Sequence, residues 1–161
     1  MMERLQKIEH VLNRFLMIIG GVAVLGLMAL ATGNVVLRVF HAPFRGAYEV
    51  VSFLGAVVIA CALGFTQKRK DNIVVNILTE RFSKRANRTL NTLSYFLTML
   101  FFAVVAWQVF VYAFHLWQGG EVSETLKLIY YPFVLITGFG FAALSFTLLV
   151  DFLVTLFKGE E

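Results

Sequence analysis

The stretch from residue 67 to residue 88, QKRKDNIVVNILTERFSKRANR, decides how this chain folds. It holds seven of the fourteen Lys and Arg residues and separates two long apolar regions, 15–66 and 89–157. Each region is long enough to cross a bilayer twice, because about 20 helical residues span the hydrocarbon core. The sequence therefore predicts one domain, residues 1–161, built from two transmembrane hairpins joined by a basic connector at 67–88.

The composition supports a membrane protein. Hydrophobic residues make up 59% of the chain and charged residues 15%, with a mean hydropathy of +0.78, whereas soluble domains average about 45–50% apolar and about 25% charged residues. Strict alternation of apolar and polar residues, which marks the strands of a membrane barrel, is absent. We expect an all-α integral membrane protein with four transmembrane helices, at about 15–38, 47–66, 90–116 and 130–157.

Two stretches beside the spans have the pattern of amphipathic helices that lie in the membrane interface. In the N-terminal stretch 1–14, Leu5, Ile8 and Leu12 recur at helical spacing among charged residues. In the connector, apolar residues share one helical face and cations line its end, which suits an anionic inner leaflet. The connector positions are Ile73, Val74, Ile77, Leu78 and Phe82 for the apolar face and Arg81, Lys84 and Arg85 for the cations.

A cleaved signal peptide is the alternative interpretation of the N-terminus. The triplet Ala29-Leu30-Ala31 resembles a small-residue cleavage site. The apolar run nevertheless continues to Leu37, and two acidic residues dilute the preceding basic region. We therefore expect an uncleaved first span.

The placement of basic residues predicts the orientation. With four spans, the N-terminus, the connector and the C-terminus share one side and carry eleven of the fourteen Lys and Arg residues, while the two short loops opposite carry three. Cytoplasmic loops are the ones enriched in Lys and Arg, so we expect both termini in the cytoplasm. Because these cations lie at the ends of apolar segments and not on a solvated face, nucleic-acid binding is not expected despite the pI of about 9.4.

Structural contacts are expected at two kinds of position. Arg38 ends the first span and Glu49 begins the second, after a turn at Pro43, so the hairpin predicts an ion pair between them. Separate contacts of each charge with lipid headgroups are the alternative. Small side chains at four-residue intervals allow close helix packing. They are Ser52, Ala56, Ala60 and Gly64 in the second span and Gly138 and Ala142 in the fourth.

No catalytic or cofactor site is recognisable. His10, His41 and His115 lie near the expected interfaces, whereas membrane haem ligands would be opposed histidines within spans. Catalytic triads, HExxH motifs and phosphate loops are absent from the sequence, and the single Cys61 cannot form a thiolate pair. We expect no enzyme activity and no cofactor, and interpret the chain as an accessory subunit of a membrane complex. The alternatives are an independent four-span channel or carrier, and the membrane anchor of a redox complex.

A series of short motifs runs along nearly the whole chain. They are Asn34-Val35-Val36-Leu37-Arg38, Pro43, Gly46-Ala47-Tyr48-Glu49, Thr66-Gln67, and the segment from Ser123 to Tyr131-Pro132. In this order and spacing they resemble the small, DctQ-like permease subunit of the TRAP transporters, the tripartite ATP-independent periplasmic carriers. One departure is that this family often has His-Ile-x-Val-Asp after the second span. This chain has Asn72 and Asn76 at the two titratable positions, so no role for a charge is expected there.

The resemblance implies a division of labour among three proteins. A large multispan permease subunit holds the sodium and substrate sites, and a periplasmic binding protein delivers an organic acid such as a C4-dicarboxylate or a sialic acid. The small subunit supports the static scaffold of the large subunit in the bacterial inner membrane, without a sodium or cofactor site of its own. Its implied partners are the large permease subunit, the periplasmic substrate-binding protein and membrane lipid.

Overall fold

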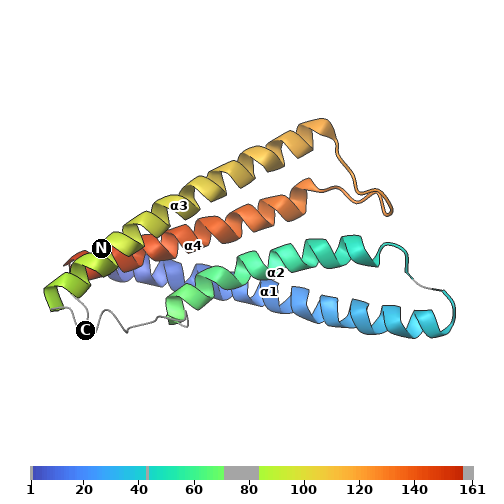
Figure 1. Ribbon diagram of the computed structural model, residues 1–161, viewed down its shortest axis with the longest axis horizontal. Coiled ribbons are helices and arrows are strands. Elements are labelled where there is room, and N and C mark those ends of the chain that lie inside the picture. The colour runs from blue at the N-terminus through green and yellow to red at the C-terminus, as the bar shows by residue number, and fades with distance from the viewer. Residues whose placement is uncertain (1, 43, 71–83, 158–161) are drawn as a thin grey trace.

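The computed structural model describes residues 2–42, 44–70 and 84–157 and arranges them as four long helices (Figure 1). The helices are α1 (Met2–Val39), α2 (Ala47–Arg69), α3 (Lys84–Gly119) and α4 (Tyr131–Phe157). Each of the four is long and apolar enough to cross a membrane. The predicted all-α class is therefore confirmed for the described residues, which include four helices of the length and apolarity that a membrane span requires.

The helices extend beyond the predicted spans. α1 begins at Met2, so the predicted N-terminal amphipathic stretch and the first span form one continuous helix. α2 continues to Arg69, and α3 begins at Lys84, with Arg85 also in its first turn. The predicted amphipathic connector helix otherwise lies outside the described residues. This applies to Ile73, Val74, Ile77, Leu78, Arg81 and Phe82, and to Asn72 and Asn76.

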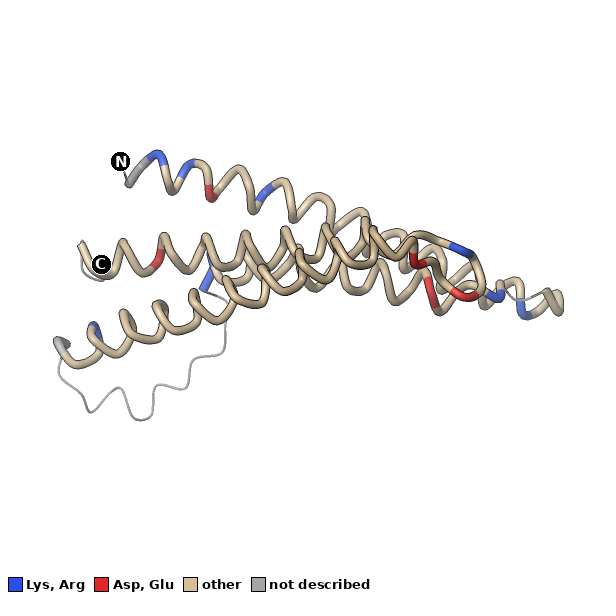
Figure 2. The backbone as a smooth tube through the Cα atoms, turned by 90° about the horizontal axis from the view of Figure 1, so that it is seen from above, with Lys and Arg blue, Asp and Glu red and all other residues tan. Residues whose placement is uncertain are grey.

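The four helices run antiparallel in chain order, which gives the bundle two distinct ends (Figures 1 and 2). The start of α1, the end of α2, the start of α3 and the end of α4 gather at one end, called here the basic end. The α1–α2 turn and the α3–α4 loop lie toward the other, the loop end. Charged positions lie toward these two ends, and the middle of the bundle carries none (Figure 2). This separation is what an apolar membrane interior requires.

α4 is the central helix of the bundle. It packs against α3 on one side and against α1 and α2 on the other (Figure 1). It approaches α2 closely at Gly140, where a Cβ would lie only 2.5 Å from the carbonyl oxygen of Ala60. The apolar core between these helices is made by Leu16, Ala23, Val57, Cys61 and Ala143.

The small residues predicted on α2 fall into two groups. Ala60 and Gly64 are buried, Ala60 against Gly140 of α4 and Gly64 against the side chain of Asn13 on α1. Ser52 and Ala56, nearer the loop end, are exposed on the surface of the bundle. The four positions therefore line a close helix contact only in the half of α2 nearer the basic end.

The small residues of α4 face two different neighbours. Gly138 faces α3, since a Cβ there would lie 3.0 Å from the ring of Phe110, and Ala142 is half-buried. The tightest contact is instead at Gly140, which the sequence analysis did not single out. Its signal in the sequence is that Gly140 and Ala143 place small residues three apart on one helical face.

Candidate functional site

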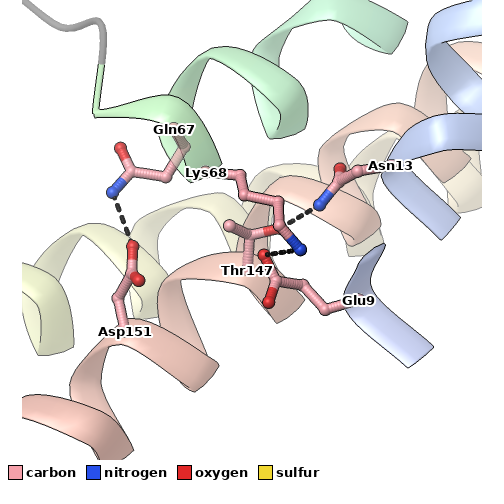
Figure 3. A network of polar contacts seen from close by, with 6 residues as sticks. All are labelled: Glu9, Asn13, Gln67, Lys68, Thr147 and Asp151. Carbon is pink, nitrogen blue, oxygen red and sulfur yellow. Dashed lines mark hydrogen bonds and ion pairs between the residues drawn. The ribbon is translucent and has the colours of Figure 1, made fainter. Parts of the chain in front are cut away.

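Six polar side chains form a network that joins three helices at the basic end (Figure 3). In this polar network, the two members on α1 and the two on α4 are each one turn apart and share a face, whereas the two on α2 are adjacent in sequence. Its members are Glu9 and Asn13 of α1, Gln67 and Lys68 of α2, and Thr147 and Asp151 of α4.

Three contacts of the polar network each cross between helices. Asn13 Nδ2 donates a hydrogen bond of 2.9 Å to Thr147 Oγ1, and these residues are 1% and 0% exposed. Gln67 Nε2 donates to Asp151 Oδ2 at 2.9 Å. Lys68 Nζ lies 3.4 Å from Glu9 Oε1, whose side chain is 7% exposed. Because the bonds join different helices, the network stabilises their association and fixes their rotation.

The amide of Asn13 also explains why Gly64 must be small. Asn13 Oδ1 is buried and has no hydrogen-bond partner among the described residues. It lies in the space that a side chain on Gly64 would fill. A larger residue at position 64 would therefore require the Asn13 amide to shift.

Sequence analysis did not predict the polar network. Glu9 and Asn13 stand four residues apart, as do Thr147 and Asp151. That spacing places each pair on one side of its helix. Polar pairs at this interval beside an apolar run are the signal that could have identified it.

A second polar contact, the outer clamp, joins the two hairpins at the loop end. The Glu49 carboxylate accepts hydrogen bonds from Ser123 Oγ at 2.8 Å and from the backbone amides of Thr125 at 2.7 Å and Leu126 at 3.0 Å. Ser123 is fully buried, and its hydroxyl also accepts a bond from the Leu128 amide at 3.0 Å. The carboxylate thus holds the α3–α4 loop against the first turn of α2.

The expected ion pair between Arg38 and Glu49 is not formed in the described part of the chain. Arg38 is exposed near the end of α1, and no described acidic group lies within ion-pair distance of it. The α1–α2 turn is closed instead by Asn34, whose Oδ1 accepts a hydrogen bond of 3.0 Å from the Phe44 amide. The predicted ion pair does not form because three donors of the α3–α4 loop already satisfy the Glu49 carboxylate.

Arg88 joins α3 to α4 at the basic end. Its Nε and Nη2 donate to the carbonyl oxygens of Thr155 at 3.1 Å and Leu156 at 2.7 Å. A cation is favourable there, because the last carbonyls of a helix carry partial negative charge. Nearby, α2, α3 and α4 border a groove of about 340 Å³. It is lined by Gln67, Lys70, Asn91, Ser94, Tyr95, Thr98 and Leu148.

The described residues contain no group of three or more His, Cys, Asp and Glu side chains that could hold a metal ion. His10 lies toward the basic end, whereas His41 and His115 lie toward the loop end, and all three are exposed. Buried polar side chains are used to join helices, while much of the remaining surface is apolar. The arrangement is suited to holding a rigid bundle within a membrane.

The comparisons with known proteins identify the family. The family model described as "Tripartite ATP-independent periplasmic transporters, DctQ component" matches residues 27–158, which include α2, α3 and α4 and the last part of α1. No curated protein and no solved structure matches the chain in these comparisons.

The DctQ component is part of a transporter and not an enzyme family. The match covers most of the chain, and the four spanning helices agree with a membrane component. The chain therefore belongs to the DctQ family, the small permease component of the TRAP transporters.

Proposed function

We propose that this chain is the scaffold subunit of a TRAP transporter. It binds the large permease subunit and supports it during sodium-coupled uptake of an organic acid of the C4-dicarboxylate or sialic acid class, delivered by a periplasmic binding protein. Family membership supports this role. The observation that carries it is the use of the polar network and the outer clamp to join helices.

The proposal also assigns the bundle to the bacterial inner membrane, with the basic end and both termini in the cytoplasm. In the sequence, the N-terminus, the connector and the C-terminus carry eleven of the fourteen Lys and Arg residues, and cytoplasmic segments are the ones enriched in them. A cysteine introduced in place of Lys84 should react with a membrane-impermeant maleimide only after cells are opened. Labelling of intact spheroplasts at this position would contradict the orientation. Cys61 is buried and serves as the background measured in the unmodified chain.

Uptake measurements test the scaffold role. Proteoliposomes containing both membrane subunits, with the binding protein outside, should accumulate the organic acid under an inward sodium gradient. Omission of this chain should lower the initial rate at least tenfold, because the large subunit then lacks its support. Liposomes containing this chain alone provide the control and should show no flux. Undiminished uptake without this chain, or flux through the chain alone, would refute the proposal; the latter would favour an independent carrier.

A further inference from the structure

One face of α3 points away from the rest of the bundle. Its residues are spaced three or four apart and so lie on one side of the helix. Ala106 and Ala113, 5% and 1% exposed, lie on the opposite side, toward α4. This surface, named here the Gln108 face, consists of Leu97, Phe101, Val104, Gln108, Tyr112 and His115, all of which are exposed.

Gln108 lies inside the predicted third span, 90–116. It stands eighteen residues from the start of that span and eight from its end, which is about 27 Å and about 12 Å along a helix. The apolar segment of α3 continues beyond Gln108 in both directions. The amide is therefore expected within the hydrocarbon core, which is about 30 Å thick, and nearer to the loop end than to the basic end.

The Gln108 amide has no hydrogen-bond partner in the parts of the chain that the structure describes. Some hydroxyl side chains on other helices form their hydrogen bonds within their own helix. Ser52 and Thr137, for example, donate to the carbonyls of Tyr48 and Phe133, each at 2.9 Å. Gln108 carries two N–H donors and a carbonyl acceptor, and lipid tails can satisfy none of them. A protein surface is therefore the favourable neighbour of this face.

We propose that the Gln108 face is the surface on which a transmembrane helix of the large permease subunit packs, with a polar group of that helix hydrogen-bonded to Gln108. The inference rests on the proposed function, and it names the surface through which that function operates. Phe101 and Tyr112, 61% and 57% exposed, supply apolar contact area on either side of the amide. The large subunit is the expected occupant because the DctQ family is one component of a tripartite transporter.

Photo-crosslinking within the assembled complex tests this surface directly. p-Benzoylphenylalanine is introduced singly in place of Phe101 or Tyr112, and for control in place of Val22 or Leu25 of α1, which are 64% and 66% exposed. Both α3 positions should yield an adduct with the large subunit, at least fivefold more abundant than at the α1 positions. Adducts to the large subunit from α1 only would overturn the inference, and so would α3 adducts that join two copies of this chain.

Substitution of Gln108 tests the hydrogen bond itself. Gln108→Leu should lower co-purification of the large subunit about threefold to tenfold, the range measured for interhelical hydrogen bonds in membranes. Gln108→Asn retains the amide and should recover at least half of the wild-type yield, and Leu25→Ala on α1 should leave the yield unchanged. Because position 108 is exposed, the isolated variant should keep the wild-type melting profile. An unchanged yield for Gln108→Leu would overturn the inference. If the wild-type chain itself failed to co-purify the large subunit, the scaffold role would fall first.

Discussion

Gly140→Ala is expected to destabilise the bundle by about 1–3 kcal/mol, the usual cost of overpacking a close contact. The added Cβ would lie 2.5 Å from the carbonyl oxygen of Ala60, 2.6 Å from its carbonyl carbon and 2.7 Å from its Cβ. Two of these atoms belong to the α2 backbone and cannot rotate away, so α2 and α4 must separate. Thermal unfolding of the purified chain in detergent measures the loss.

The chain offers matched glycine controls for this substitution. Gly55→Ala adds the same methyl group to α2, where the new Cβ would meet nothing within 4 Å. It should leave stability unchanged or slightly higher, because alanine is favoured over glycine within a helix. Gly138→Ala should fall between the two, since the Phe110 ring 3.0 Å away is a side chain that can shift. Equal melting temperatures for Gly140→Ala and Gly55→Ala would contradict the assigned α2–α4 contact.

Lys68→Met should lower stability by about 2 kcal/mol, because it leaves the carboxylate of Glu9 buried without its cation. Breaking a fully buried ion pair costs roughly 3–5 kcal/mol. The Glu9 side chain is 7% exposed but that of Lys68 is 27% exposed, and solvent access to the lysine reduces the loss. Lys68→Arg keeps the positive charge and should retain most of the stability.

A double-mutant cycle separates this pair from general effects of the substitution. Glu9→Gln combined with Lys68→Met removes both charges, so the double variant should regain more than half of the stability lost in Lys68→Met. The melting temperatures of the four proteins in one detergent give the coupling energy. If the two losses were simply additive, the contact would contribute nothing, and the network would depend on its Asn13–Thr147 and Gln67–Asp151 bonds alone.

The four spanning helices could be predicted from sequence because the requirements of a membrane are local. An apolar run of sufficient length must form a helix in lipid, since only its own backbone can satisfy its hydrogen bonds. The short connections between successive spans then require neighbouring helices in the sequence to run in opposite directions. The family motifs are likewise short local patterns, and the family match confirms the resemblance they gave.

The helix contacts could not be predicted in the same way, because they depend on which face each helix turns to its neighbours. Gly138 and Gly140 are two residues apart, about 200° around a helix. They therefore face α3 and α2 respectively, and only the rotation of α4 determines which contact is tighter. The same rotation brings Thr147 to Asn13 and Asp151 to Gln67, across more than 80 residues of sequence.

Glu49 shows most clearly which features the sequence predicts and which depend on tertiary packing. Its sequence neighbourhood suggested Arg38 as the partner, because the two residues flank one short turn. Its actual partners begin 74 residues later, at Ser123. The sequence alone determined that a carboxylate would stand at the membrane boundary. Only the packing of α4 beside α2 carried the α3–α4 loop over that carboxylate, where backbone amides and a buried hydroxyl satisfy its charge at short range.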